Sequence, residues 1–360
     1  MSRQSELAEL GRIYSQTALS NRNLIINGAM KVAQRGTSST TNASFTTDRF
    51  INFQNIGTFT AEQSTDAPDG FQYSLKRTNG TGTTATSSDY SLVRYQVEGF
   101  DAVQLSQATS SAKTVTISFW VKSSVTGTYF VALTDANDLV QYPAAYTVNS
   151  ANIWEKKEVT ITGYTGSSGT WNKDNTIGLK IHWDLGSGPS RQAPTADAWN
   201  TSLSGSWSHS SQVDWVGTTG ATFYLTGVQL EVGDTATPFE HRSYGDELAR
   251  CQRYFISYGR SALSNNAIYL GIGQAVTSTN AAVTITPPVT MRASPTFSSK
   301  GVDSIVVNNG TSRTSTSLSG GDSKPDVLFV SINTTSGMST AQAVRAFLTG
   351  NHYISFDAEL

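Results

Sequence analysis

One stretch, residues 221–255, constrains the fold of this chain more than any other. Its first part alternates apolar and polar residues and is rich in β-formers, which predicts a strand built on Phe223, Leu225, Val228 and Leu230. A turn signal at Gly233-Asp234 follows, and Pro238 favours extended chain at Thr237. The period then changes, and residues 247–255 (ELARCQRYF), with an acidic start and two arginines near the end, predict a short helix. The stretch therefore divides one β-domain from a second, smaller one.

The composition supports a mostly β chain. Charged residues make up 14% of the 360 residues, against about a quarter in typical globular domains, and there are 30 glycines against 9 prolines. Serine, threonine, asparagine and glycine are abundant instead, which favours strands and turns over helices.

Charge and cysteine content exclude several classes of protein. The net charge is −2 and no block of Lys or Arg is present, so we expect no nucleic-acid partner. The single cysteine, Cys251, excludes an internal disulfide framework. No apolar run suits a signal peptide or a membrane span, which predicts a soluble protein made in a cytoplasm without a standard export signal and without membrane insertion.

The N-terminal segment, residues 1–20, carries an apolar stripe at helical spacing: Leu7, Leu10, Ile13 and Tyr14. A helix this short is not stable alone in water, so it must dock. We expect it to attach the chain to another protein or to form an oligomer seam; packing on its own β-domain is the alternative.

Residues 21–240 read as one domain with about eight to ten strands at the spacing of a β-sandwich. Leu24-Ile25-Ile26 predicts a first strand, followed by a turn at Asn27-Gly28. The strongest alternation covers 115–121, with Trp120 on the opposite face. Residues 241–258 are the expected linking helix, and 259–360 the second β-rich domain, predicted as a smaller sandwich. Within it, residues 339–352 suggest a brief helix or turn, and the chain ends in a strand at Tyr353–Phe356.

Loops rich in tryptophan are the candidate binding region. The segment 186–220 lacks periodicity and is long for a loop in a compact domain, which is usual for functional or disordered loops; tryptophan argues against disorder. Aromatic rings among short polar side chains suit sugars, which stack on the ring and hydrogen-bond to the polar groups. The candidates are Trp171, Trp199, Trp207 and Trp215. The alternative is that these rings pin a long loop to its domain or to a neighbouring subunit.

Catalytic signals are missing from the sequence. The four histidines are scattered without metal-ligand spacing, and no nucleophile elbow, Walker A or dinucleotide motif is present. Six aspartates could form a glycosidase pair but read more simply as turn residues: Asp135, Asp138, Asp174, Asp184, Asp197 and Asp214. We expect no catalytic residues, no cofactor and no metal.

Three blocks together resemble tail-fibre proteins of tailed bacteriophages, especially viruses of cyanobacteria and other marine bacteria. They are NRNLIINGAMKVAQRGTS (21–38), TVTISFWVKSSVTGTYFV (114–131) and the long block 219–255. The resemblance covers roughly residues 20 to 256. It implies a jelly roll of the carbohydrate-binding-module, galactose-binding type, with the NLIINGAM and GVQLE blocks as its paired first and last strands.

The resemblance also bears on metal binding. Many sugar modules of this shape hold a structural calcium with acidic residues after the NG turn and before the closing strand. Here those places hold Ala29–Lys31 and Thr226-Gly227, and Glu231 alone remains, so calcium is not expected.

The expected function follows from the resemblance. It implies a structural virion protein, a homotrimeric tail-fibre or appendage subunit that contacts tail or neck proteins through its N-terminal region and a host-surface glycan elsewhere. Leu248, Cys251 and Phe255, at helical spacing, would form a trimer seam. Such a protein is assembled in the host cytoplasm and is extracellular in the mature particle. The alternatives are a polysaccharide depolymerase tailspike, a connector with virion partners alone, or a module of a secreted enzyme.

Overall fold

The computed structural model describes residues 21–201, 205–259, 268–300, 304–308, 311–348 and 352–360. The chain divides into two units, residues 1–244 with Leu360 and residues 245–359. The expected N-terminal helix, with Leu7, Leu10 and Ile13, lies outside the described residues. No helix in the described part of the chain is long and apolar enough to cross a membrane.

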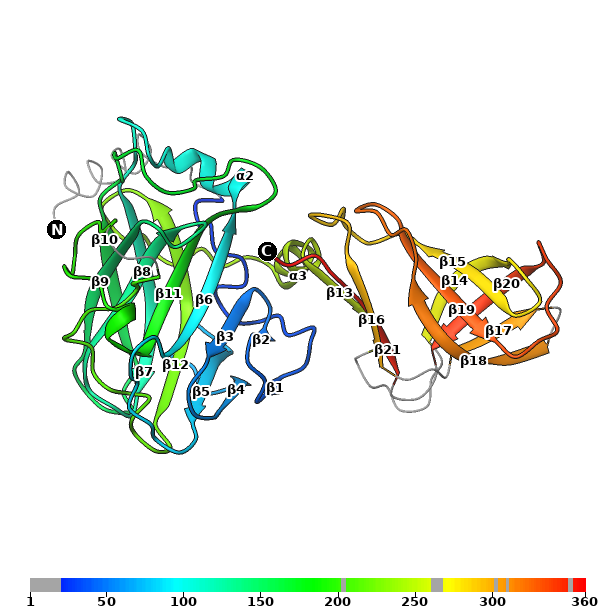
Figure 1. The fold of residues 1–360 in the computed structure, drawn as a ribbon, viewed down its shortest axis with the longest axis horizontal. Helices are drawn as coiled ribbons and strands as arrows, with labels where there is room; N and C mark the ends of the chain where they lie inside the picture. Colours follow the sequence, from blue (N-terminus) through cyan, green and yellow to red (C-terminus); the bar gives the residue numbers. More distant parts are fainter. Residues whose placement is uncertain (1–20, 202–204, 260–267, 301–303, 309–310, 349–351) are drawn as a thin grey trace. The chain divides into compact units, whose positions relative to one another are not determined.

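The first unit is a sandwich of two six-stranded sheets whose neighbouring strands all pair antiparallel (Figure 1). We call them sheet 1 and sheet 2. In spatial order, sheet 1 contains β1 (Ser38–Ser39), β4 (Phe59–Ser64), β5 (Ser74–Asn79), β12 (Thr222–Val232), β7 (Val115–Ser123) and β10 (Glu155–Ile161). Sheet 2 contains β2 (Ser44–Thr47), β3 (Phe50–Gln54), β6 (Tyr90–Glu98), β11 (Ile177–Ser187), β8 (Gly127–Asp135) and β9 (Gln141–Val148).

The connections make this sandwich a jelly roll. From β5 onwards the chain changes sheet at nearly every connection, and only β8 and β9 follow each other within one sheet. Short helical turns interrupt the connections: α2 (Gly99–Ala102), η1 (Val103–Leu105) and η2 (Pro189–Arg191). The predicted mostly β fold with a jelly-roll domain is therefore confirmed.

Alternation along the central strands produces the core. On β7, Val115, Ile117, Phe119 and Val121 are buried between the sheets, as the sequence predicts, while Trp120 lies on the other face and keeps partial exposure. Trp183 of β11 contacts the ring of Phe50 on β3 of its own sheet and the ring of Phe119 on β7 of the facing sheet. The core thus forms where apolar residues recur at every second position.

The first and last segments of the unit meet as expected, although residues 24–26 do not form a strand of either sheet. Leu24 N–H donates to the Leu230 carbonyl at 3.0 Å, and Val228 N–H donates to the Gly28 carbonyl at 3.0 Å. Next to these contacts, between Thr226 and Gln229, the pairing of β12 with β7 shifts register, and Gly227 there has a φ of +60°, which suits glycine. The bulge turns the end of β12 toward the N-terminal segment.

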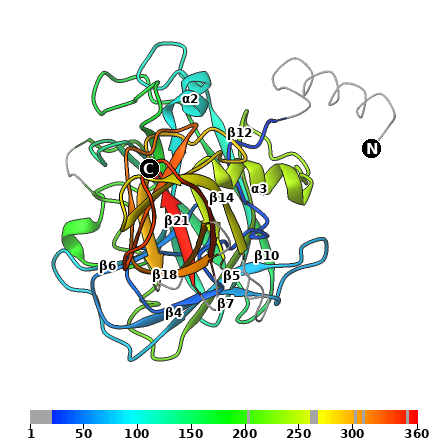
Figure 2. The same cartoon turned by 90° about the vertical axis from the view of Figure 1, so that its right-hand side faces the viewer.

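The second unit contains a closed six-stranded barrel and a three-stranded sheet. The barrel runs β14 (Ile268–Ala275), β15 (Asn280–Ile285), β19 (Leu328–Thr334), β18 (Thr311–Gly320), β17 (Ser304–Asn308) and β20 (Ala343–Leu348). The sheet runs β13 (Phe255–Tyr258), β21 (Tyr353–Asp357) and β16 (Thr296–Lys300), with the last strand of the chain, β21, at its centre (red in Figure 2). The expected second sandwich thus takes the form of a barrel with an adjoining sheet.

Two expectations in this part of the chain are wrong. Residues 343–348 form β20 rather than a helix, because alternate residues Val344, Ala346 and Leu348 face the barrel core. Phe255 does not extend the helix: α3 (Tyr244–Gln252) ends before it, and Phe255 opens β13 opposite Asp357. Cys251 and Phe255 are buried by their own chain, and of the proposed trimer seam Leu248 alone keeps partial exposure.

Candidate functional site

Two of the four candidate tryptophans are core residues. Trp215 is 0% exposed, and its indole N–H donates to the Thr222 carbonyl at 3.2 Å. Trp207 is 3% exposed, donates to the Ser187 hydroxyl at 3.0 Å and stacks on His182. The expectation that these two rings present a face to a sugar is wrong; they pin the loop 186–220 to the sandwich, which is the alternative reading of the sequence.

The other two candidates, Trp171 and Trp199, come together in an aromatic cluster. Trp199 lies 6.1 Å from Trp171 and 5.2 Å from Tyr164, measured between ring centroids, and 5.3 Å from Tyr142. Tyr164 and Trp171 stack at 5.9 Å. Both tyrosines are buried, whereas both tryptophans keep partial exposure. The buried tyrosines therefore support two indoles that reach the surface.

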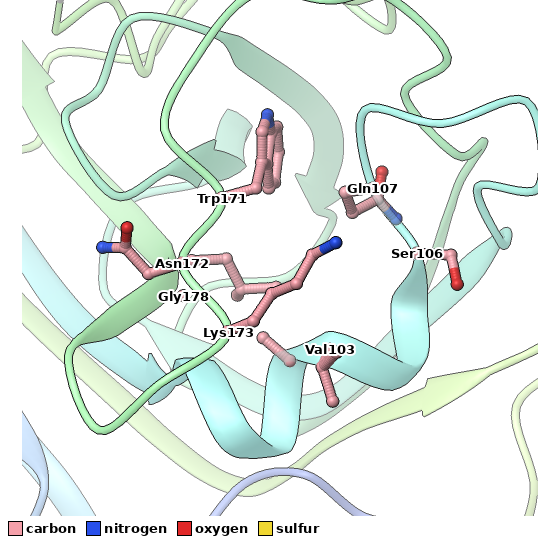
Figure 3. A pocket seen from close by; sticks show the side chains of 9 residues that line it. Val103, Ser106, Gln107, Trp171, Asn172, Lys173 and Gly178 are labelled. Carbon is pink, nitrogen blue, oxygen red and sulfur yellow. The ribbon is translucent and has the colours of Figure 1, made fainter.

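Trp171 borders a shallow surface depression (Figure 3). Its other walls come from the α2–η1 turn and from the start of β11, with Val103, Ser106 and Lys173 at its rim. Val103 is 45% exposed and adds an apolar surface beside the indole. Asn172 also lines the depression, but its side chain turns away and donates to the Ile177 carbonyl at 2.9 Å.

Backbone contacts hold the two sides of the depression together. Phe100 N–H donates to the Asp174 carbonyl at 2.9 Å, and Gly99 N–H donates to the Thr176 carbonyl at 2.8 Å. A Cβ at Gly99 would lie 2.7 Å from the carbonyl oxygens of Asn172 and Asp174, so only glycine permits this approach. Gln107 fixes the neighbouring loop, because its side-chain oxygen accepts from Tyr164 N–H at 2.7 Å. Hydrogen bonds therefore fix the loops that carry the residues of the depression.

The six candidate aspartates have structural partners. Asp135 accepts three backbone N–H groups of its own turn and a fourth from Thr170. Asp174 and Asp214 accept from residues two and three positions ahead. Asp197 accepts from Ala145 N–H, and the buried Asp184 accepts from Gly186 N–H and the Ser187 hydroxyl. Burial raises the pKa of Asp184 to about 7.

Asp138 belongs to a charged group on the outer surface of sheet 2. Its carboxylate lies 2.8 Å from Lys180 and 3.1 Å from His182, and Trp207 covers the imidazole. Burial opposes ionisation of Asp138, but His182, Lys180 and Arg94 hold the pKa of its carboxyl well below its usual range. Burial lowers the pKa of His182 to about 4. Since His182 is fully covered, it cannot reach a substrate, and this group braces the sheet.

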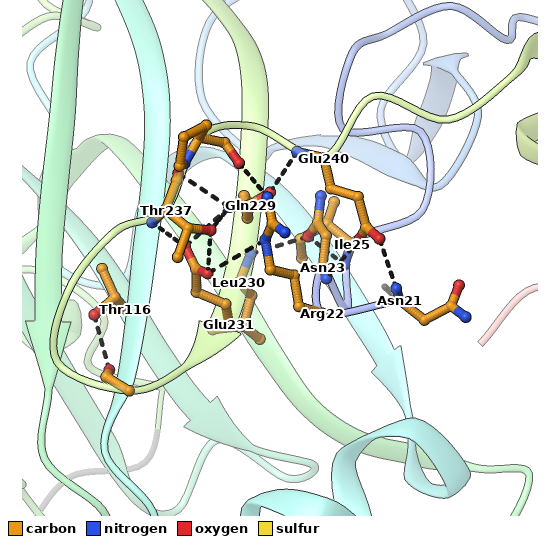
Figure 4. Close-up of polar contacts among 12 residues, drawn as sticks. Asn21, Arg22, Asn23, Ile25, Thr116, Gln229, Leu230, Glu231, Thr237 and Glu240 are labelled. Atoms are coloured by element: carbon orange, nitrogen blue, oxygen red, sulfur yellow. Dashed lines mark hydrogen bonds and ion pairs between the residues drawn. The ribbon is translucent and has the colours of Figure 1, made fainter. Parts of the chain in front are cut away.

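The residues at the position where similar sugar modules hold calcium do not fit a metal ion. Glu231 is 0% exposed, and donors surround its carboxylate (Figure 4). Its oxygens accept from Gln229 Nε2 at 2.9 Å, Thr237 N–H at 2.8 Å and the Thr237 hydroxyl at 2.6 Å, and Arg22 Nε lies 3.8 Å away. Among the described residues, no group of three or more His, Cys, Asp or Glu side chains could hold a metal.

Further bonds join the N-terminal segment to the strap that follows β12. Glu240 accepts from the N–H groups of Asn21 and Asn23 at 2.6 and 2.9 Å, and Arg22 donates to the Pro238 carbonyl at 2.5 Å. Arg242 donates to the carbonyls of Asn23 and Ile25. We call the group Arg22, Asn23, Gln229, Glu231, Thr237, Glu240 and Arg242 the clasp. It joins the two segments that calcium would otherwise stabilise.

Removal of divalent cations should therefore leave the first unit intact. We expect EDTA to leave its Tm unchanged, because the clasp uses protein donors in place of a cation. Thermal unfolding followed by tryptophan fluorescence tests this, since all seven tryptophans lie between residues 120 and 215. A fall in Tm on chelation that calcium reverses would show that the clasp does not replace the metal.

Sequence reasoning missed the tyrosines and the rim of this site. Tyr164 stands in a Gly/Ser-rich loop, as the candidate tryptophans do, so the same rule could have included it. Tyr142 lies on β9, and Val103, Ser106 and Lys173 lie on turns with no composition signal. These residues meet because the β6–β7, β8–β9 and β10–β11 connections lie at the same end of the sandwich.

Comparisons with known proteins concern the fold alone. No protein-family model and no curated protein matches the chain. Solved structures similar to it include the enzymatically active domain of bacteriophage CBA120 tailspike protein 4, at 10% identity and a TM-score of 0.33. That match covers 59% of this chain and 22% of the tailspike chain, so this chain spans well under half the length of the tailspike chain.

Two further similar structures are carbohydrate-related. A putative sugar-binding protein from Bacteroides thetaiotaomicron has 13% identity and a TM-score of 0.36, and the match covers 59% of this chain and 100% of that protein. The CBM22-1 xylan-binding domain of Paenibacillus barcinonensis Xyn10C has 12% identity and a TM-score of 0.30, and the match covers 61% of this chain and 100% of that domain.

Proposed function

We propose that this chain is a glycan-binding structural subunit of a bacteriophage tail or appendage. The observation that carries the binding part is Trp171, a partly exposed indole that is backed by Tyr164 and borders a depression. The family resemblance of residues 20–256 supports the virion part. The chain acts by adhesion and catalyses no reaction.

The site matches the chemistry of a sugar ring. A pyranose has an apolar C–H face, which packs on an aromatic face, and hydroxyls around its edge that need donors and acceptors. Trp171 and Val103 offer the apolar surface, and Ser106 and Lys173 offer polar groups at the rim. Because Lys173 is the charged residue of this lining, the site accepts neutral and acidic sugars.

The subunit assembles as a homotrimer in the host cytoplasm and is exposed on the mature particle. Its N-terminal segment contacts other tail or neck proteins. Sedimentation equilibrium of the full chain tests the oligomeric state: a trimer is expected, and a monomer at micromolar concentration would contradict this part.

Binding is tested on the full chain with an array of bacterial surface glycans. We expect Trp171→Ala to weaken binding to a glycan recognised by the wild type about 30-fold, the factor that corresponds to roughly 2 kcal/mol at a buried aromatic contact. Trp154→Ala is the matched control, because Trp154 packs beside Tyr224 of sheet 1 and does not line the depression. Equal binding by wild type and Trp171→Ala would contradict the site. Release of new reducing ends from a bound polysaccharide would favour the depolymerase instead.

A further inference from the structure

A second pocket lies at the other end of β11. Trp171 borders the start of this strand at Gly178, whereas the second pocket includes Gly186 and Ser187 at its end, roughly 25 Å away along an extended strand. Its cavity volume is about 130 Å³. The remaining lining comes from the β5–β6 connection and the loop 186–220: Thr84, Ala85, Gln192, Gln212, Val213 and Asp214.

The lining is polar and carries no cation. Two glutamine amides, two hydroxyls and one carboxylate surround the space, and Ala85 and Val213 supply a small apolar surface. Amides and hydroxyls both donate and accept, whereas a carboxylate accepts only and repels anions. This combination suits a neutral molecule with several hydroxyl groups and disfavours an acidic one.

The polar groups are already held in place. Gln192 Nε2 donates to the Ser187 carbonyl at 2.9 Å, and Gln212 Nε2 donates to the Asp184 carbonyl at 3.0 Å. Asp214 accepts from the Thr84 hydroxyl at 3.0 Å and from Gly217 N–H at 2.9 Å. A ligand would therefore meet fixed partners, which lowers the entropy lost on binding.

Trp207 explains why the loop holds this shape. Its indole N–H donates to the hydroxyl of Ser187, which in turn donates to the buried carboxyl of Asp184. The ring thus anchors one wall of the pocket from behind without facing the ligand.

We propose that this pocket is a second binding site that takes one neutral sugar residue. It goes beyond the proposed function, because it uses different residues and selects against acidic sugars, which the Trp171 site admits. The two sites can fail or succeed separately.

The test is ¹⁹F NMR of the full chain labelled with 5-fluorotryptophan. The Trp207 signal reports the second pocket and the Trp171 signal reports the aromatic site; Trp207→Phe and Trp171→Phe identify them. The probes are glucose, galactose, mannose and N-acetylglucosamine, with glucuronic acid as the charged comparison, at millimolar concentrations. We expect at least one neutral sugar to move the Trp207 signal and glucuronic acid to leave it in place.

Three variants make the result specific. Gln192→Ala/Gln212→Ala should weaken the Trp207 response at least tenfold, while the exposed Gln72→Ala, outside the pocket, should leave it unchanged. Asp214→Asn keeps the side-chain shape and should admit glucuronic acid. No response of Trp207 to any neutral sugar, or an unchanged response in the double variant, would overturn the proposal. If sugars move the Trp207 signal but not the Trp171 signal, the second site is supported and the Trp171 site is contradicted.

Discussion

Glu231→Ala is expected to lower the free energy of unfolding of the first unit by about 3–5 kcal/mol, the usual cost of breaking a buried charge pair from one side. The carboxylate is fully buried, accepts hydrogen bonds from Gln229 and Thr237, and lies 3.8 Å from Arg22 Nε. Without it, the buried Thr237 N–H loses its acceptor, and Gln229 keeps its longer bonds to Thr237 at 3.2 and 3.4 Å. The guanidinium of Arg22 loses a nearby negative charge. The bonds of Glu240 and Arg242 to the N-terminal segment would remain, but the buried centre of the clasp would be lost.

Urea unfolding monitored by tryptophan fluorescence measures this effect on the first unit, which contains all seven tryptophans. Glu231→Gln is the matched control, since it keeps the shape and part of the hydrogen bonding and should cost less than the alanine variant. A loss under about 1 kcal/mol for Glu231→Ala, in the range of an exposed ion pair, would mean that the clasp does not stabilise the unit.

Gly28→Ala is expected to destabilise the same unit by about 1–3 kcal/mol, the usual cost of forcing extra atoms into a packed site. A Cβ at Gly28 would lie 2.1 Å from the Val228 carbonyl oxygen, a backbone atom of β12 that cannot turn away. The N-terminal segment would have to move and lose its bond from Val228 N–H.

Gly245→Ala is the control for this substitution, because no atom lies within 4 Å of its added Cβ. We expect it to leave the fluorescence transition unchanged. Equal stability of the Gly28→Ala variant and the wild type would show that the segment 21–28 does not pack tightly on β12.

The regular part of the fold was predictable from local pattern. Strand β7 shows strict alternation over 115–121, and a strand of this kind buries one face whatever its neighbours are. The end of β12 was less predictable, since the bulge at Gly227 and the bonds to residues 24–28 depend on contacts distant in sequence. The same reason explains residues 343–348: their local spacing suits a helix, but the barrel core selects alternate residues.

Two of the four candidate tryptophans were expected at the surface but are buried, and the cause is the tertiary structure of their loop. Composition places Trp199, Trp207 and Trp215 in similar polar surroundings, yet the loop folds back so that the last two are covered. Sequence alone cannot tell which aromatic residue of a long loop ends inside. The binding roles of Trp171 and Trp199 stay a prediction.

The most direct test of the central claim is a crystal structure of the full chain with an array-positive oligosaccharide. The proposal predicts a sugar ring packed on Trp171, with hydroxyl groups near Lys173 and Ser106. A bound oligosaccharide that leaves the Trp171 depression empty would contradict it.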